Sequence, residues 1–162
     1  MKKCTGILLM IMVLLVSGCG SKVSSDTVSM YDLRVAMEAA DDSLPTMLNA
    51  SSTEDSAKEN FAYFSDLEYD KVDSYFLSYS EDGSKADEIA VIAVKDPADV
   101  QEAKKSLEEH KEERYKLLEQ YEPEQTRGIE EGLVFTSGQY AVLVICDDSS
   151  AVKAAFQEIV SE

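Results

Sequence analysis

The stretch Glu88-Ile89-Ala90-Val91-Ile92-Ala93-Val94 decides the fold. After its single charged residue every position is apolar, without the alternation that marks a strand with one face in water. An uninterrupted apolar strand is typical of a place where both faces of the sheet are covered. We therefore expect residues 88–94 to form a central strand.

The residues before this stretch form its hairpin partner. From Val72 onward the chain alternates, and Asp82-Gly83 supplies a turn, a pattern that predicts a strand and a hairpin. A second hairpin is predicted over residues 133–136 and 140–146, with Ser137-Gly138 at its tight turn. We expect the two apolar strands, 88–94 and 140–146, to lie side by side in the middle of the sheet.

Helices are predicted after each hairpin and at the start of the domain. Asp96 and Pro97 form a helix start, and the helix runs to about Tyr121. The remaining expectations are a helix at 30–40 capped by Ser29, a polar loop at 49–55, a short helix at 56–64, a turn or helix between Pro123 and Gly128, and a last helix capped by Asp148 or Ser149.

The predicted element order is α-α-β-β-α-β-β-α, in which a hairpin followed by a helix occurs twice. Hairpins imply antiparallel pairing. We therefore expect an α+β fold, a two-layer sandwich whose helices pack on a mainly antiparallel four-stranded sheet. Residues 28–162 are expected to form this single domain.

The N-terminus carries an export signal. Lys2 and Lys3 precede the apolar run Ile7–Val16, which is too short to span a bilayer as a helix. The following residues, Val16-Ser17-Gly18-Cys19, resemble the lipobox of bacterial lipoproteins, in which the cysteine sulfur receives a diacylglyceryl group. We expect residues 1–18 to be a cleaved signal peptide, Cys19 to be lipidated, and residues 19–27 to be a flexible tether that holds the domain at the extracytoplasmic face of the cell membrane.

The net charge of the chain excludes some classes of binding partner. Its formal net charge is −17, and loss of residues 1–18 removes two lysines and no acid, which makes the charge −19. Such acidity argues against binding to nucleic acid or to anionic headgroups. The expected contact with the membrane is the lipid on Cys19, and an envelope protein is a further expected partner.

The long helix carries the candidate site. His110 and Arg114, four positions apart, interrupt its core-facing stripe of Val100, Ala103, Leu107, Leu117 or Leu118, and Tyr121. Two donors on a buried face need partners, so they mark either the floor of an anion-binding cleft or a place where the helix overhangs its sheet and meets solvent or an acidic side chain. Zinc needs several convergent ligands, and with only His110 and Cys146 we expect no metal and no cofactor. Cys146 is expected to be a small buried hydrophobe.

Three other patterns in the sequence are each similar to a chemical motif but incomplete. The acidic run from Asp66 lacks a calcium loop's central glycine, because Lys71 stands there. Ser150-Ala151-Val152-Lys153 matches S-x-x-K without its companion motifs. Asp87 and Glu88 could serve a carboxylate-dependent hydrolase, but adjacent strand residues point to opposite faces. No catalytic residue is predicted.

Several short motifs resemble a known family. Ala86-Asp87-Glu88-Ile89-Ala90-Val91 before the Pro97 helix, Tyr121-Glu122-Pro123-Glu124 at its end, and Gly138-Gln139-Tyr140 in the second hairpin look like a domain-of-unknown-function family of short lipoproteins from Gram-positive, clostridia-like bacteria. The resemblance covers about residues 28–160. It implies location and fold, and it carries over no catalytic residue.

These observations together predict a lipid-anchored, extracytoplasmic module that binds a protein or a small ligand and is not an enzyme. The alternatives are an accessory subunit of an envelope transporter or wall-assembly complex, and an envelope hydrolase built on carboxylates.

Overall fold

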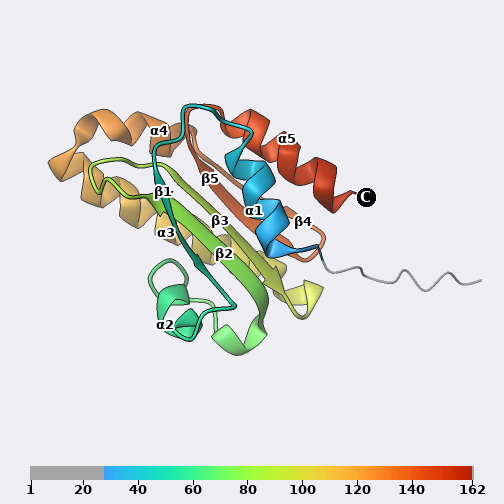
Figure 1. Cartoon of the computed structure of the whole chain (residues 1–162). Helices are drawn as coiled ribbons and strands as arrows, with labels where there is room; N and C mark the ends of the chain where they lie inside the picture. The colour runs from blue at the N-terminus through green and yellow to red at the C-terminus, as the bar shows by residue number, and fades with distance from the viewer. Residues whose placement is uncertain (1–27, 162) are drawn as a thin grey trace, which may run out of the picture.

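The computed structural model describes residues 28–161. Their strands form one five-stranded sheet with the order β1-β2-β3-β5-β4, and each neighbouring pair is antiparallel (Figure 1). The predicted signal peptide 1–18, Cys19 and the tether lie outside the described residues. The strands are β1 (Met47–Ser51), β2 (Val72–Ser80), β3 (Glu88–Val94), β4 (Leu133–Ser137) and β5 (Tyr140–Ile145).

The stretch 88–94 is the central strand, as predicted. All seven residues of β3 are buried, and β3 pairs with β2 on one side and with β5 on the other. The predicted adjacency of the two apolar strands is therefore confirmed. Both hairpins are also confirmed, and Gly138 turns the second one with a φ of 54°, a left-handed conformation that glycine adopts without strain.

The prediction of four strands was wrong, because residues 47–51, which overlap the predicted polar loop 49–55, form a fifth strand, β1. β1 is an edge strand whose ladder partner is β2, with Ala50 opposite Leu77 and Asn49 opposite Ser78. Only Ala50 of its five residues is buried. An edge strand with so small a buried face has little apolar pattern to read, so the sequence did not indicate it.

The two-layer arrangement was also wrong, because helices cover both faces of the sheet. Odd-numbered residues of β3 pack with α1 (Met30–Glu38) and α5 (Ser149–Val160), whereas even-numbered residues pack with the opposite helices. Those are α2 (Ala57–Phe61), α3 (Val100–Tyr121) and α4 (Thr126–Glu131). Figure 1 shows α3 behind the sheet and α1 and α5 in front of it. The fold is α+β with three layers.

The helix starts follow the predicted caps. The side chains of Ser29, Asp96 and Asp148 accept hydrogen bonds from the backbone N–H groups two or three residues further along. The ends differ slightly: α1 stops at Glu38, and α2 is shorter than predicted. The turn or helix expected after Pro123 is a 3-10 turn followed by α4.

The core-facing stripe of α3 ends earlier than predicted. Leu118 is buried, whereas Leu117 is 52% exposed and Tyr121 is 71% exposed. The last turn of α3 therefore projects beyond the sheet. None of the helices in residues 28–161 is both long enough and apolar enough to cross a membrane.

Candidate binding cleft

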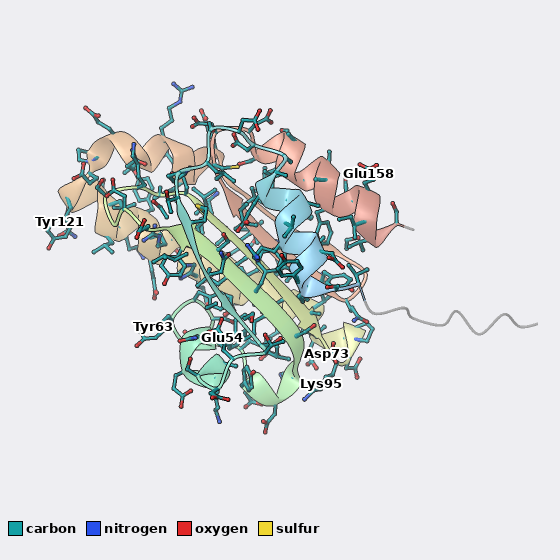
Figure 2. The ribbon with its side chains drawn as sticks, viewed as in Figure 1. Glu54, Tyr63, Asp73, Lys95, Tyr121 and Glu158 are labelled. Carbon is teal, nitrogen blue, oxygen red and sulfur yellow. The ribbon has the colours of Figure 1, made fainter. Side chains whose placement is uncertain are left out.

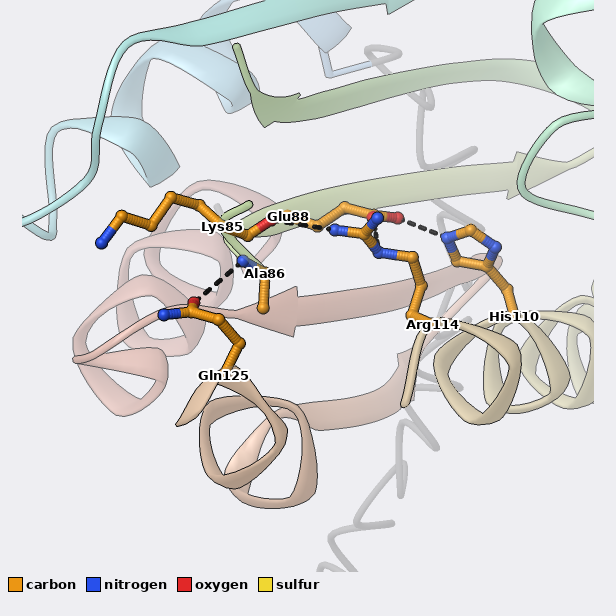
Figure 3. Close-up of polar contacts among 6 residues, drawn as sticks. All are labelled: Lys85, Ala86, Glu88, His110, Arg114 and Gln125. Carbon is orange, nitrogen blue, oxygen red and sulfur yellow. Dashed lines mark hydrogen bonds and ion pairs between the residues drawn. The ribbon is translucent and has the colours of Figure 1, made fainter. Parts of the chain in front are cut away.

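His110 and Arg114, the two residues singled out from the sequence, meet on one buried carboxylate. His110 Nε2 lies 2.6 Å from Glu88 Oε1, and Arg114 Nε lies 3.2 Å from Glu88 Oε2 (Figure 3). The Glu88 side chain is only 4% exposed, against 12% for His110 and 22% for Arg114. The sequence indicated the two donors and allowed an acidic side chain as their partner, but it did not identify Glu88 as that side chain.

The fold brings Glu88, His110 and Arg114 together. Glu88 begins β3 and, as an even-numbered residue, points to the face that α3 covers. His110 and Arg114 lie one helical turn apart and so face the same way from α3. A buried carboxylate is costly unless it is paired, and these two partners compensate Glu88 from one side.

Backbone contacts hold the cluster in place. Arg114 Nη2 donates to the carbonyl oxygen of Lys85 at 3.2 Å, and the Gln125 side chain accepts from the N–H of Ala86 at 3.1 Å (Figure 3). The segment that leads into β3 is thus tied to α3 through Arg114 and to the turn between α3 and α4 through Gln125. Arg114 Nε is in ion-pair range of Glu88 but is buried without a well-directed acceptor among residues 28–161.

A cleft of about 580 Å³ opens beside this cluster. α3 packs over β3, β5 and β4, whereas α2 packs over β1 and, through the contact of Phe61 with Tyr75, over the first half of β2. The cleft lies between the two helices, over the second half of β2. The β2 residues Leu77 and Tyr79 line this part of the sheet, and Tyr63 and Phe64, which follow α2, line one side. Glu81, Gly83 and Lys85 from the β2–β3 turn line the mouth. The volume is in the range of small-molecule sites.

The cleft has an aromatic rim, an apolar wall and an ionic floor, which is formed by Glu88, His110 and Arg114. Tyr63 is 81% exposed, and Figure 2 shows it projecting outward from the region of α2. Tyr79 is 37% exposed, whereas Phe64 and Leu77 are buried. Phe64 also packs edge to face with the His110 ring, at 6.3 Å between centroids. Sequence reasoning missed these residues, because no local pattern relates the end of α2 to β2.

Asp87 lies away from Glu88, as expected for adjacent strand residues. It lines a separate pocket of about 200 Å³ together with Cys146 and Asp147. Burial raises the pKa of Asp87, and the carboxylates of Asp147 and Asp41 add to the effect. The two carboxylates considered for a hydrolase therefore belong to different pockets.

The polar groups of Cys146 and Asp41, at and beside the second pocket, are buried or engaged in hydrogen bonds that hold the fold together. Cys146 is 9% exposed, as predicted for a small buried hydrophobe, and burial raises the pKa of its thiol to about 12. Burial also tends to raise the pKa of Asp41, but hydrogen bonds from Ser43 and from the N–H of Asp148 outweigh it and hold that pKa below its usual value. Asp41 thereby ties the end of α1 to the start of α5. Within residues 28–161 no three His, Cys, Asp or Glu side chains gather as metal ligands.

A comparison with protein families finds one that is described as a domain of unknown function, DUF4358, which matches residues 46–146. The matched segment begins just before β1 and ends just after β5, so it contains all five strands, α2, α3, α4 and the cleft. No curated protein and no solved structure matches the chain.

Proposed function

The chain belongs to the DUF4358 family of domains of unknown function, and from its own residues we propose that it is a lipid-anchored, extracytoplasmic module that binds a small ligand without transforming it. The observation that carries the binding proposal is the cleft beside the buried Glu88–His110–Arg114 cluster. Three ionisable side chains held together at the end of an apolar core are costly to build, and such groups gather at functional sites.

Binding is favoured over hydrolysis by the placement of the carboxylates. Glycoside hydrolysis needs two carboxyl groups that flank the same bond. Glu88 lies against two cationic or hydrogen-bonding partners, and Asp87 lines another pocket. The arrangement suits a fixed polar surface that orients a ligand.

A blocking substitution tests the binding site. A Cβ added at Gly83, in the mouth of the cleft, would meet no atom within 4 Å, and its φ is not in the left-handed region. Gly83→Tyr should therefore fold normally and obstruct the cleft. Gly128→Tyr is the matched control, because Gly128 is equally open and lies outside the cleft.

The assay is equilibrium dialysis of each variant against a low-molecular-mass extract of the cell envelope, followed by mass spectrometry of the retained compounds. The proposal predicts a compound retained by the wild type and by Gly128→Tyr but lost with Gly83→Tyr. Equal retention by all three proteins, or by none, would contradict binding in the cleft.

The anchor is proposed from the N-terminal residues alone. Two acyl chains on Cys19 would hold the protein stably at a membrane. The tether of residues 20–27 reaches at most about 28 Å, so the domain would work close to the bilayer, while its negative charge would oppose contact with an anionic leaflet. Cys19→Ala should leave the protein unprocessed or release it into the medium, and Cys4→Ala should not change it, because residue 4 is removed with the signal. Unchanged membrane retention of the processed Cys19→Ala protein would refute the anchor.

A second candidate is an accessory subunit of an envelope transporter or wall-assembly complex. The observation that favours it is the edge position of β1 in the sheet that residues 28–161 form, where Leu48 is 41% exposed. Edge strands can pair with a strand from another protein. A photo-crosslinking residue at position 48 should then capture one membrane protein in native membranes, whereas the same residue at exposed Tyr121 should not.

A further inference from the structure

The charged groups of the cleft balance one another, unlike those of the chain as a whole. Glu81 and Glu88 contribute two negative charges, and Lys85 and Arg114 contribute two positive ones, with histidine counted as neutral. The whole chain carries −17. A strongly acidic protein repels anions at long range, and Arg114 beside the cleft floor opposes a bound cation. The charge distribution therefore favours a ligand with no net charge.

The ionic groups of the floor are already paired with one another. Glu88 contacts both His110 and Arg114, and Arg114 also donates to the Lys85 carbonyl. A charged ligand group would have to break these contacts. A hydroxyl group, in contrast, both donates and accepts, so it can add to a carboxylate and a guanidinium that lie side by side.

The walls suit a ligand with flat apolar faces. Tyr63 and Tyr79 are partly exposed rings at the rim, and Phe64 and Leu77 form an apolar wall. A tyrosine ring offers a large apolar surface that is ordered at low entropic cost and carries a hydrogen-bonding hydroxyl at its end. Pyranose sugars combine the two matching features, since their C–H faces are apolar and their edges carry hydroxyls.

We propose that the cleft binds a neutral carbohydrate, with the Tyr63 and Tyr79 rings against the sugar faces and the Glu88–His110–Arg114 floor hydrogen-bonding the hydroxyl edge. This inference rests on the proposed function of the cleft as a ligand site and names the class of ligand. The volume of about 580 Å³ and the exposed position of Tyr63 fit an oligosaccharide lying across the opening.

The test uses chitotetraose, cellotetraose and maltotetraose as neutral probes, and citrate, spermidine and glutamate as charged or zwitterionic ones. The full chain is purified in a detergent without a sugar headgroup, because a glycoside detergent would compete for the cleft. Binding is measured by saturation-transfer NMR and titration at millimolar probe. We expect at least one tetrasaccharide to bind. Citrate, spermidine and glutamate should not bind.

Tyr63→Ala locates the contact without endangering the fold, because the side chain is 81% exposed. It should weaken sugar binding about tenfold, the effect of losing one stacked ring. Tyr121→Ala is the matched control, as an exposed tyrosine outside the cleft, and should leave binding unchanged.

Three results would overturn the inference. If no tetrasaccharide binds, or if binding survives both Tyr63→Ala and Gly83→Tyr, the cleft is not a sugar site. If citrate, spermidine or glutamate binds instead and is lost with Gly83→Tyr, the ligand class is wrong while the proposed function of the cleft stands.

Discussion

Substitution of Glu88 by glutamine removes the charge that joins α3 to β3 and keeps the size of the side chain. The remaining partners, Arg114 and His110, are 22% and 12% exposed, so Arg114 would be left as a largely buried cation without its carboxylate. Removing one partner of a fully buried pair costs about 3 to 5 kcal/mol. Because water still reaches Arg114, we expect a smaller loss of about 2 kcal/mol in the free energy of unfolding.

The assay is urea unfolding of Glu88→Gln against the wild type, with Glu81→Gln as the control. Glu81 is an exposed carboxylate in the turn before β3, and its substitution should change the free energy of unfolding by less than about 0.5 kcal/mol. In a double-mutant cycle, Glu88→Gln combined with Arg114→Gln should show a coupling of at least about 1 kcal/mol. If Glu88→Gln costs no more than the control, or if the coupling is zero, the cluster does not stabilise this part of the fold.

Other predictions concern the second pocket and the segment before β2. Asp87→Asn should raise stability at pH 7 but not at pH 3. Burial raises the pKa of Asp87 in the folded protein, so its ionised form destabilises the fold once the pH rises above the pKa of the unfolded chain. Denaturation midpoints at both pH values test this prediction. Cys146 should react with iodoacetamide at pH 8 at least about tenfold more slowly in the folded than in the unfolded protein, because burial raises the pKa of its thiol to about 12 and shields the sulfur; equal rates would contradict burial. Ser106→Ala should cost about 1 to 3 kcal/mol, because Ser106 Oγ accepts from the N–H of Asp66 at 2.8 Å and pairs with Ser65 Oγ at 2.7 Å; an unchanged urea midpoint would show that water replaces these bonds.

The central hairpins and the helix starts could be predicted because their signals are local. The apolar run of β3 and the caps at Ser29, Asp96 and Asp148 each lie within a few residues of the element that they define. The run of β3 also implied helices on both faces, since a strand buried on both sides needs two covering layers. α1 and α5 form the second of these layers, which a two-layer sandwich lacks.

β1 could not be predicted, because its place in the fold depends on distant residues. Its pairing with β2 supplies the backbone hydrogen bonds, and only Ala50 needs to be apolar. Nothing within residues 47–51 distinguishes such a strand from a loop.

The candidate site was predicted in part. His110 and Arg114 stand out because they interrupt an apolar stripe, which is a local signal. Glu88 is the single charged residue at the start of an apolar strand, and that signal was present too. Their meeting depends on where α3 crosses β3, which tertiary packing decides. No local sequence pattern marks Tyr63, which lines the cleft because of where α2 lies in the fold.

The central claim is that a ligand binds beside His110, and this residue is the one histidine in the chain. A protein labelled with ¹³C-histidine therefore gives a single imidazole signal that reports on the cleft floor. Titration with the tetrasaccharides should shift this signal in a saturable way in the wild type and in Gly128→Tyr, and not in Gly83→Tyr. A sugar that binds while the His110 signal stays unmoved would place the ligand elsewhere and contradict the claim.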